Sequence, residues 1–118
     1  MTDVLLALLI IVFGSHAKDP ELMWAAQTRA NYMAATQVCS HHGYHAYNLV
    51  IQSGQRFTGG GEVVACNNYP NSADVAVRGW LASPEHRELL LQPNLTQIGI
   101  GTAVGKNGIC YWSVVVTD

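Results

Sequence analysis

The chain has 118 residues, of which 49% are apolar and 12% are charged. That length provides one domain with one hydrophobic core, and that composition excludes an intrinsically disordered protein. Six Lys and Arg against eight Asp and Glu give a formal charge of −2, with no basic cluster. This balance excludes binding to nucleic acid, or to an anionic membrane surface, through positive charge.

The N-terminal segment is apolar from Val4 to Phe13. A membrane-spanning helix needs about 20 such residues, so we expect no transmembrane span here. The length of the run is typical of a signal-peptide core, and the small residues Ser15 and Ala17 precede a cleavage point before Lys18. This pattern predicts a protein that is secreted to the extracellular space or the periplasm.

The leader also has an alternative interpretation. It carries Asp3 and neither Lys nor Arg, whereas signal peptides open with positive charge. A first helix of the domain, buried on all sides, would have the same apolar composition. We therefore divide the chain into a signal peptide or apolar leader over residues 1–17 and a domain over residues 18–118.

The domain is predicted to open with a helix at Asp19-Pro20-Glu21. The Asp caps the helix, the Pro fits the first helical position and the Glu favours the positive end of the helix dipole. An apolar stripe at helical spacing extends this helix to about Gln37. Arg29 alone interrupts the stripe, and we expect its aliphatic stem to lie along the apolar side chains.

The segment from Ser40 to Tyr69 has no periodic pattern long enough to define an element, apart from strand character at Glu62–Ala65. A long segment without regular structure is uncommon inside a compact domain unless it carries function. Two short helices follow it. Asn71-Ser72 opens the first of them, and Ser83-Pro84-Glu85 opens the second, which we expect to run from Pro84 to about Leu91.

The chain closes with two predicted strands, Gln97–Val104 and Ile109–Val116. Asn107-Gly108 between them is a strong hairpin signal. Gly99 and Gly101 alternate with apolar residues in the first strand, so we expect a helix to pack closely on the glycine face. Helices followed by a terminal hairpin predict a layered α+β domain.

Three cysteines are present: Cys39, Cys66 and Cys110. They match no zinc-ribbon spacing. In an oxidising compartment they would form one disulfide and leave one free thiol. The sequence does not choose among the three pairs, of which Cys66–Cys110 would close a loop of about 45 residues. The alternative is three buried, reduced cysteines that act as small apolar residues.

Three short segments contain residues that could carry chemistry. His41 and His45 are four residues apart, as zinc ligands on one helix often are, although Gly43 between them disfavours a helix. Glu62 follows three glycines, which allow a close backbone approach that presents the carboxylate at the start of a strand. His86 lies in the first turn of the short helix that begins at Pro84. Each of these residues also has an ordinary structural interpretation, as part of a polar loop, a surface turn or a satisfied histidine.

The ordered set of these segments resembles the CAP superfamily, the cysteine-rich secretory, antigen 5 and pathogenesis-related-1 proteins, also called SCP-like domains. The resemblance is to the short bacterial members and covers about Leu22 to Val116. It rests on five segments in order: the Leu22, Ala25, Ala26, Ala30 helix, Ser40-His41, Gly61-Glu62, Trp80 to Arg87, and Gly99-Ile100-Gly101 with Tyr111-Trp112.

The resemblance implies a three-layer α-β-α sandwich with an antiparallel sheet and a cleft that holds a His-Glu-Glu-His tetrad. The first His falls on His41, the first Glu on Glu62 and the second His on His86, whereas the second Glu falls on Ser83. The tetrad is therefore incomplete. The chain also has Val63 where the family has Asn, and its apolar leader replaces the family's first helix.

These residues support two function hypotheses. The favoured one is a secreted, monomeric binding domain whose cleft, lined by His41, Glu62, Ser83 and His86, takes a small ligand, a lipid or a protein partner, with or without a divalent metal such as Zn²⁺. The alternative is a zinc-assisted hydrolase in which His41 and His86 are ligands and Glu62 is the general base or third ligand. The missing second Glu favours binding over catalysis. A purely structural role for a degenerate domain is the third possibility.

Overall fold

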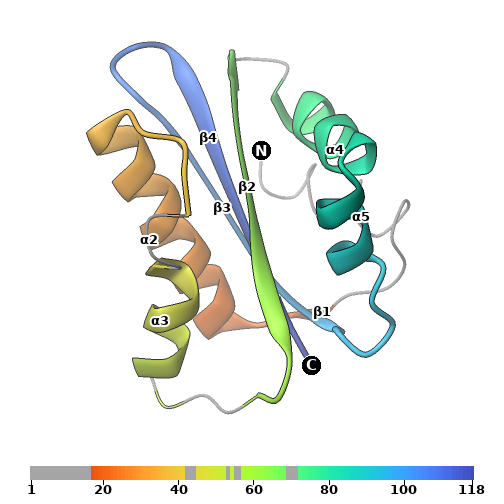
Figure 1. Cartoon of the computed structure of the whole chain (residues 1–118). Helices are drawn as coiled ribbons and strands as arrows, with labels where there is room; N and C mark the ends of the chain where they lie inside the picture. The colour runs from red at the N-terminus through yellow and green to blue at the C-terminus, as the bar shows by residue number, and fades with distance from the viewer. Residues whose placement is uncertain (1–16, 42–44, 53, 55–56, 69–71) are drawn as a thin grey trace.

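A computed structural model describes residues 17–41, 45–52, 54, 57–68 and 72–118 (Figure 1). Apart from Ala17, the predicted leader lies outside the described residues. Within the described part of the chain, no helix has the length and apolar character that crossing a membrane requires.

The first long helix, α2 (Pro20–Thr36), begins where the sequence predicts. The Asp19 carboxylate caps it by accepting hydrogen bonds from the backbone N–H groups of Glu21 and Leu22, at 2.9 and 3.0 Å. The helix ends one residue earlier than predicted, because Gln37 adopts a left-handed conformation (φ 58°) and closes the last turn through the Met33 carbonyl.

Two elements in the middle of the chain were not fully predicted. The helix α3 (His45–Gln52) has only eight residues, and its Ala46 and Val50 are buried against α2. The strand β2 (Gly60–Asn68) is longer at both ends than the predicted Glu62–Ala65. Both elements depend on packing against other parts of the fold, which local periodicity does not contain.

The remaining elements confirm the predicted order. They are α4 (Ser72–Ala82), α5 (Pro84–Leu90), β3 (Gln97–Val104) and β4 (Ile109–Thr117). The turn between β3 and β4 contains Gly108 with a φ of 79°, and the Asn107 side chain accepts a hydrogen bond from the Ile109 N–H at 3.1 Å. The α+β class is therefore correct.

The sheet has the order β1-β3-β4-β2 and is mixed rather than wholly antiparallel. The three long strands pair antiparallel as predicted, but the two-residue strand β1 (Ala17–Lys18) pairs parallel with β3 at Gln97 and Ile98. Strand β1 comes directly before α2 in the chain. It enters the sheet in the same direction as β3, and this makes their pairing parallel. At the other side, β2 pairs with β4 alone among the described strands and lies at the edge of the sheet.

Helices cover both faces of the sheet, α2 and α3 on one side and α4 and α5 on the other (Figure 1). The helix α2 lies very close to β3, as the glycine pattern predicts. A Cβ atom at Gly99 would lie 2.1 Å from the Leu22 carbonyl carbon, and one at Gly101 would lie 2.4 Å from the Ala26 oxygen. Only glycine fits at these two positions.

The structure has one disulfide, between Cys39 and Cys66, and leaves Cys110 as a buried thiol. Of the three pairs that the sequence leaves open, the structure therefore has Cys39–Cys66. In the ladder Cys66 is opposite Tyr111 and Cys110 is opposite Asn67. This one-residue offset places the two cysteine side chains on opposite faces of the sheet.

The end of β4 is tied to the segment that leads into β2. The Asp118 carboxylate accepts hydrogen bonds from the backbone N–H groups of Thr58 and Gly59, at 2.9 and 3.0 Å, and from the Thr58 hydroxyl. These contacts fix the start of β2, the strand that carries Glu62.

Candidate functional site

Glu62 is an acidic residue in the third position of β2, and its side chain is fully buried. Its neighbour Val63 belongs to the core on the α4–α5 side of the sheet. Because successive side chains of a strand alternate between the faces, Glu62 points to the side that α2 and α3 cover.

His41 contacts Glu62 directly. Its Nδ1 atom lies 2.9 Å from Glu62 Oε1, and 37% of the His41 side chain is exposed. This hydrogen bond joins the exposed loop to the buried carboxylate of β2. The disulfide supports the contact, because Cys39 lies two residues before His41 and Cys66 lies four residues after Glu62.

A third charged group, Arg29 of α2, is completely buried. Its guanidinium lies 5.6 Å from the centre of the Tyr32 ring, and its three nitrogen atoms have no hydrogen-bond partner among the residues that the structure describes. Burial lowers the pKa of Arg29 from its ordinary value, and the charges of Glu62 and Tyr32 oppose that lowering. In the sequence, Arg29 is the one charged residue in an apolar helical stripe, and that pattern alone predicts only packing of its aliphatic stem.

Ser83 and His86 lie together beside the same edge strand, in a groove of about 390 Å³. One wall is β2 from Val64 to Asn67, and the other is formed by α4 and the start of α5. The full lining is Cys39, Val64, Ala65, Cys66, Asn67, Val75, Ala76, Gly79, Trp80, Ser83 and His86.

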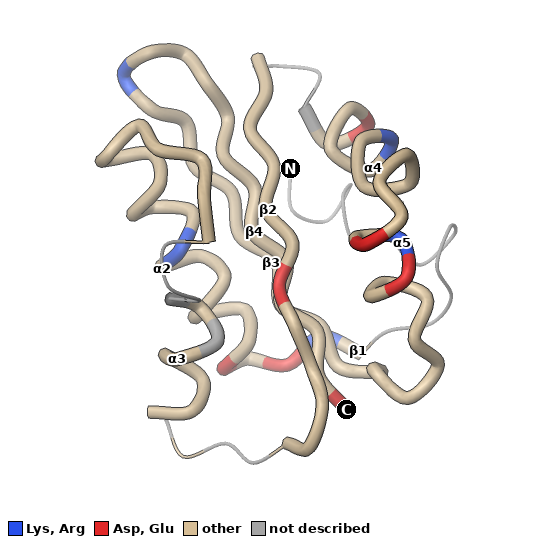
Figure 2. The backbone as a smooth tube through the Cα atoms, viewed as in Figure 1, with Lys and Arg blue, Asp and Glu red and all other residues tan. Residues whose placement is uncertain are grey.

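Most residues that line the groove are apolar, and its polar side chains are Asn67 of β2 and Ser83 and His86 at the start of α5. The Trp80 indole closes part of the edge of β2, because its Nε1 donates a hydrogen bond to the Val64 carbonyl at 3.1 Å. The charges of α4 lie outside the groove, where Arg78 and Asp74 form an exposed pair at 2.6 Å. Figure 2 shows that the α4–α5 layer carries charges of both signs.

The four predicted cleft residues therefore form two pairs around β2. His41 contacts Glu62, and Ser83 lines the groove with His86, whereas neither His41 nor Glu62 belongs to the groove lining. Cys39 and Cys66 connect the two pairs, because both line the groove next to the His41 loop.

The two histidines predicted as zinc ligands lie apart in this arrangement, because His86 lines the groove and His41 does not. Among the described residues, no three His, Cys, Asp or Glu side chains gather closely enough to hold a metal ion. The described part of α3 does not include the His45 side chain. We therefore derive no reaction step through a metal at this site.

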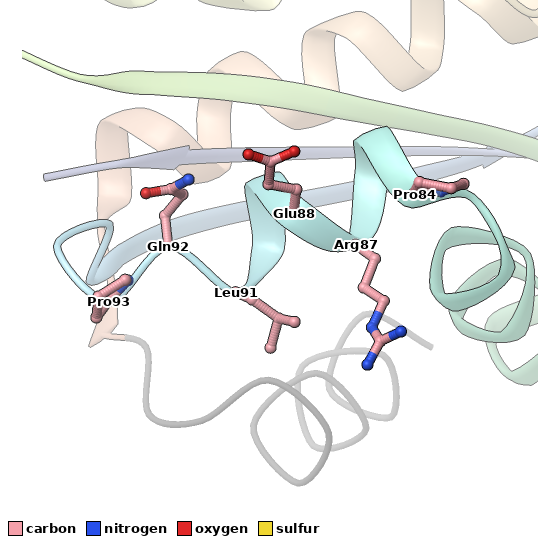
Figure 3. Close-up of a pocket in the computed structure, with 6 residues that line it drawn as sticks. All are labelled: Pro84, Arg87, Glu88, Leu91, Gln92 and Pro93. Carbon is pink, nitrogen blue, oxygen red and sulfur yellow. The ribbon is translucent and has the colours of Figure 1, made fainter.

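A second hollow, of about 410 Å³, lies beside α5 and the turn that follows it. Pro84, Arg87, Glu88, Leu91, Gln92 and Pro93 line it, with Arg87 and Leu91 directed to the same side of the helix (Figure 3). This lining contains none of the four predicted cleft residues, so we place the candidate site at β2.

Comparison with protein families gives one match over most of the chain. The sequence model described as "CAP: Cysteine-rich secretory protein family" matches residues 17–116. No curated protein matches the chain.

Solved structures share the fold. An outer surface protein from Borrelia burgdorferi is 18% identical with a TM-score of 0.86, and the match covers 99% of this chain and 91% of that one. An extracellular protein with an SCP domain from Bacillus anthracis is 20% identical with a TM-score of 0.76, over 98% of this chain and 40% of that one. A cysteine-rich secretory protein from Staphylococcus aureus is 16% identical with a TM-score of 0.61, over 98% and 38%. The chain thus spans about two fifths of the last two proteins.

Proposed function

This chain belongs to the CAP family of cysteine-rich secretory proteins, and from that premise we propose that it is an extracellular binding domain. Its ligand is a small amphipathic molecule that lies in the groove beside β2. Relatives of this fold include an extracellular protein and an outer surface protein, and a disulfide is typical of an oxidising compartment.

The shape and lining of the groove carry this proposal. Its volume of about 390 Å³ is within the range of small-molecule sites, which combine an apolar body with a few polar groups. Val75, Ala76 and Trp80 would contact the apolar part of the ligand. Ser83 and His86 would hydrogen-bond its polar group.

Binding is favoured over hydrolysis because the residues for hydrolysis are not gathered. The family resemblance places a second Glu where this chain has Ser83, and the described residues contain no cluster of three metal ligands. His41 and Glu62 are hydrogen-bonded to each other, but they lie outside the groove lining.

The experiment tests the groove with a substitution that places a larger side chain inside it. Gly79 lines the groove, and a Cβ atom built there has nothing within 4 Å, so Gly79→Leu adds a side chain without a clash at its root. Arg78→Leu is the matched control, because Arg78 is the next residue on the same helix and its side chain is exposed.

We would titrate the ¹⁵N-labelled oxidised chain with decanol and with decanoate, each below its micelle concentration, and follow amide and indole resonances. The proposal expects saturable shifts at Val64–Asn67 and at the Trp80 indole, lost in Gly79→Leu and retained in Arg78→Leu. Shifts that are equal in both variants, or no saturable shift with either probe, would overturn it.

A zinc arm tests the alternative function. Calorimetric titration with Zn²⁺ is compared between the unmodified chain and the double variant His41→Ala/His86→Ala. Micromolar binding, about −8 kcal/mol, that is abolished in the double variant would favour the metal-assisted hydrolase and count against our choice. Absence of such binding supports a metal-independent groove.

A further inference from the structure

The groove beside β2 has an uncharged lining. Among the described residues that line it there is no Lys, Arg, Asp or Glu. The two charges of α4, Arg78 and Asp74, pair with each other outside the groove. Of the charges of α5, Arg87 and Glu88 line the second hollow and Glu85 is exposed. A charged group of a ligand therefore meets no counter-charge in the described lining.

Ser83 brings to this groove a hydroxyl that does not cap its own helix. The residue is the N-cap of α5 and has extended backbone angles (φ −99°, ψ 115°), but its side chain makes no capping hydrogen bond. A serine at an N-cap ordinarily accepts from a backbone N–H of the first helical turn. The backbone of Ser83 is bonded normally, to the Trp80 carbonyl at 3.3 Å and to the Arg87 N–H at 2.9 Å. The hydroxyl is therefore available to a ligand.

His86 provides a second polar group close to that hydroxyl. It lies three residues after Ser83, and residues at this spacing are neighbours on a helix surface. Both side chains line the groove, and both are partly exposed. A hydroxyl and a neutral imidazole can each donate and accept a hydrogen bond. This pair therefore matches a ligand group that also donates and accepts, such as an alcohol.

The other polar groups of the lining have partners within the protein. The Trp80 indole Nε1 donates to the Val64 carbonyl at 3.1 Å, so the indole offers a ligand its ring rather than its N–H. Asn67 has a further interaction within the chain. Among the described side chains of the groove, polar recognition is therefore concentrated at Ser83 and His86.

We infer that the groove selects an uncharged amphipathic ligand whose polar group is a hydroxyl, and that Ser83 determines this selection. The inference rests on the proposed function and adds the chemical class of the ligand. A carboxylate that leaves water needs a counter-charge or several hydrogen bonds in exchange. In this groove it stays in water at the mouth, whereas an alcohol exchanges its water for the Ser83 hydroxyl and the His86 ring.

The test compares decanol with decanoate, which have the same chain length and differ in the polar group. Each is titrated below its micelle concentration into the ¹⁵N-labelled oxidised chain at pH 8. The amide resonances of Val64–Asn67 and the Trp80 indole resonance report binding. Any preference of an apolar surface for the alcohol is the same in all variants, so a change of the preference on substitution isolates the role of Ser83.

We expect Ser83→Ala to weaken decanol binding about fivefold, which is the effect of one hydrogen bond, and to leave decanoate binding unchanged. Ser83→Thr keeps the hydroxyl and should retain decanol binding. Ser83→Lys adds the missing cation and should strengthen decanoate binding about threefold. Thr36→Ala is the matched control, because it removes a hydroxyl of α2 that bonds the Tyr32 carbonyl and is not part of the groove lining.

Unchanged decanol binding in Ser83→Ala, or equal weakening of decanol and decanoate, would overturn the inference and leave the proposed function in place. Absence of saturable shifts with both probes in the unmodified chain would overturn the proposed function and the inference together. Far-UV circular dichroism checks that each variant folds. If Ser83→Ala does not fold, Ser83→Gly takes its place, because glycine is well accepted at an N-cap.

Discussion

Cys39 and Cys66 join the loop that carries His41 to the strand that carries Glu62. The disulfide and the His41–Glu62 hydrogen bond are therefore two connections between the same two segments. The first is covalent and lies next to the groove, and the second is polar and partly buried.

Removal of the disulfide should destabilise the fold. The bridge spans a sequence separation of 27 residues, which corresponds to about 3.5 kcal/mol in the chain-entropy description. We expect Cys39→Ser/Cys66→Ser to lower the free energy of unfolding by about that amount, measured by urea denaturation. A reductant should destabilise the unmodified protein equally and leave the double variant unchanged. Equal stability with and without reductant would contradict the bridge.

Glu62→Ala should cost about 3–5 kcal/mol of unfolding free energy, because it leaves the Arg29 charge buried without its counter-charge. The double variant Arg29→Met/Glu62→Leu should recover most of this loss, since it removes both charges. Asp74→Ala is the control, because its pair with Arg78 is exposed and should contribute about 0.5 kcal/mol or less. If the double variant is less stable than Glu62→Ala, the two charges are not coupled.

Two glycine substitutions should change the stability of the fold in opposite directions. Gly99→Ala forces the added Cβ into the Leu22 backbone, so the helix must move away from the sheet, at a cost of about 3 kcal/mol. Gly79→Ala lies in α4 with open space around the added atom, and should stabilise the fold by about 0.5–1 kcal/mol. Thermal unfolding of the two variants measures the difference, and equal melting temperatures would refute it.

The contacts of the Asp118 carboxylate should make the stability of the fold depend on pH in the acidic range. Hydrogen bonds from Thr58 hold the pKa of Asp118 below its ordinary value of 3.8. A lowered pKa means that the contribution is present above the ordinary value and is lost as the pH falls through the folded-state value. We expect Asp118→Asn to have a lower melting temperature than the unmodified chain at pH 6, and the difference to shrink as the pH falls below 3.8. A difference that is independent of pH would show that the charge is not involved.

The sequence alone predicts those features of the fold that depend on a few neighbouring residues. The Asp19 cap, the proline at position 84 and the Asn107-Gly108 turn fix where helices start and where the hairpin bends. The glycines of β3 also predicted the close approach of α2, because only a missing side chain allows it. Each of these depends on a few neighbouring residues.

The features that the sequence alone does not predict depend on contacts between segments that are distant in the chain. The helix α3 is stabilised by burial against α2, and the cysteine pairing is decided by which face of the sheet each side chain occupies. At the candidate site, the sequence and family resemblance identified His41 and Glu62 but treated Arg29 only as an interruption of an apolar stripe. A charged residue at a core position is a usable signal, although its partner cannot be read from spacing.

The hydrogen bond between the Trp80 indole and the Val64 carbonyl has a consequence for the behaviour of the protein at high concentration. Exposed edge strands add further strands from other molecules, and this is a common route to aggregation. In this fold the edge strand β2 has Trp80 on its backbone at the centre and a covalent bridge at Cys66. The residues that wall the groove therefore also keep the sheet from growing at that edge.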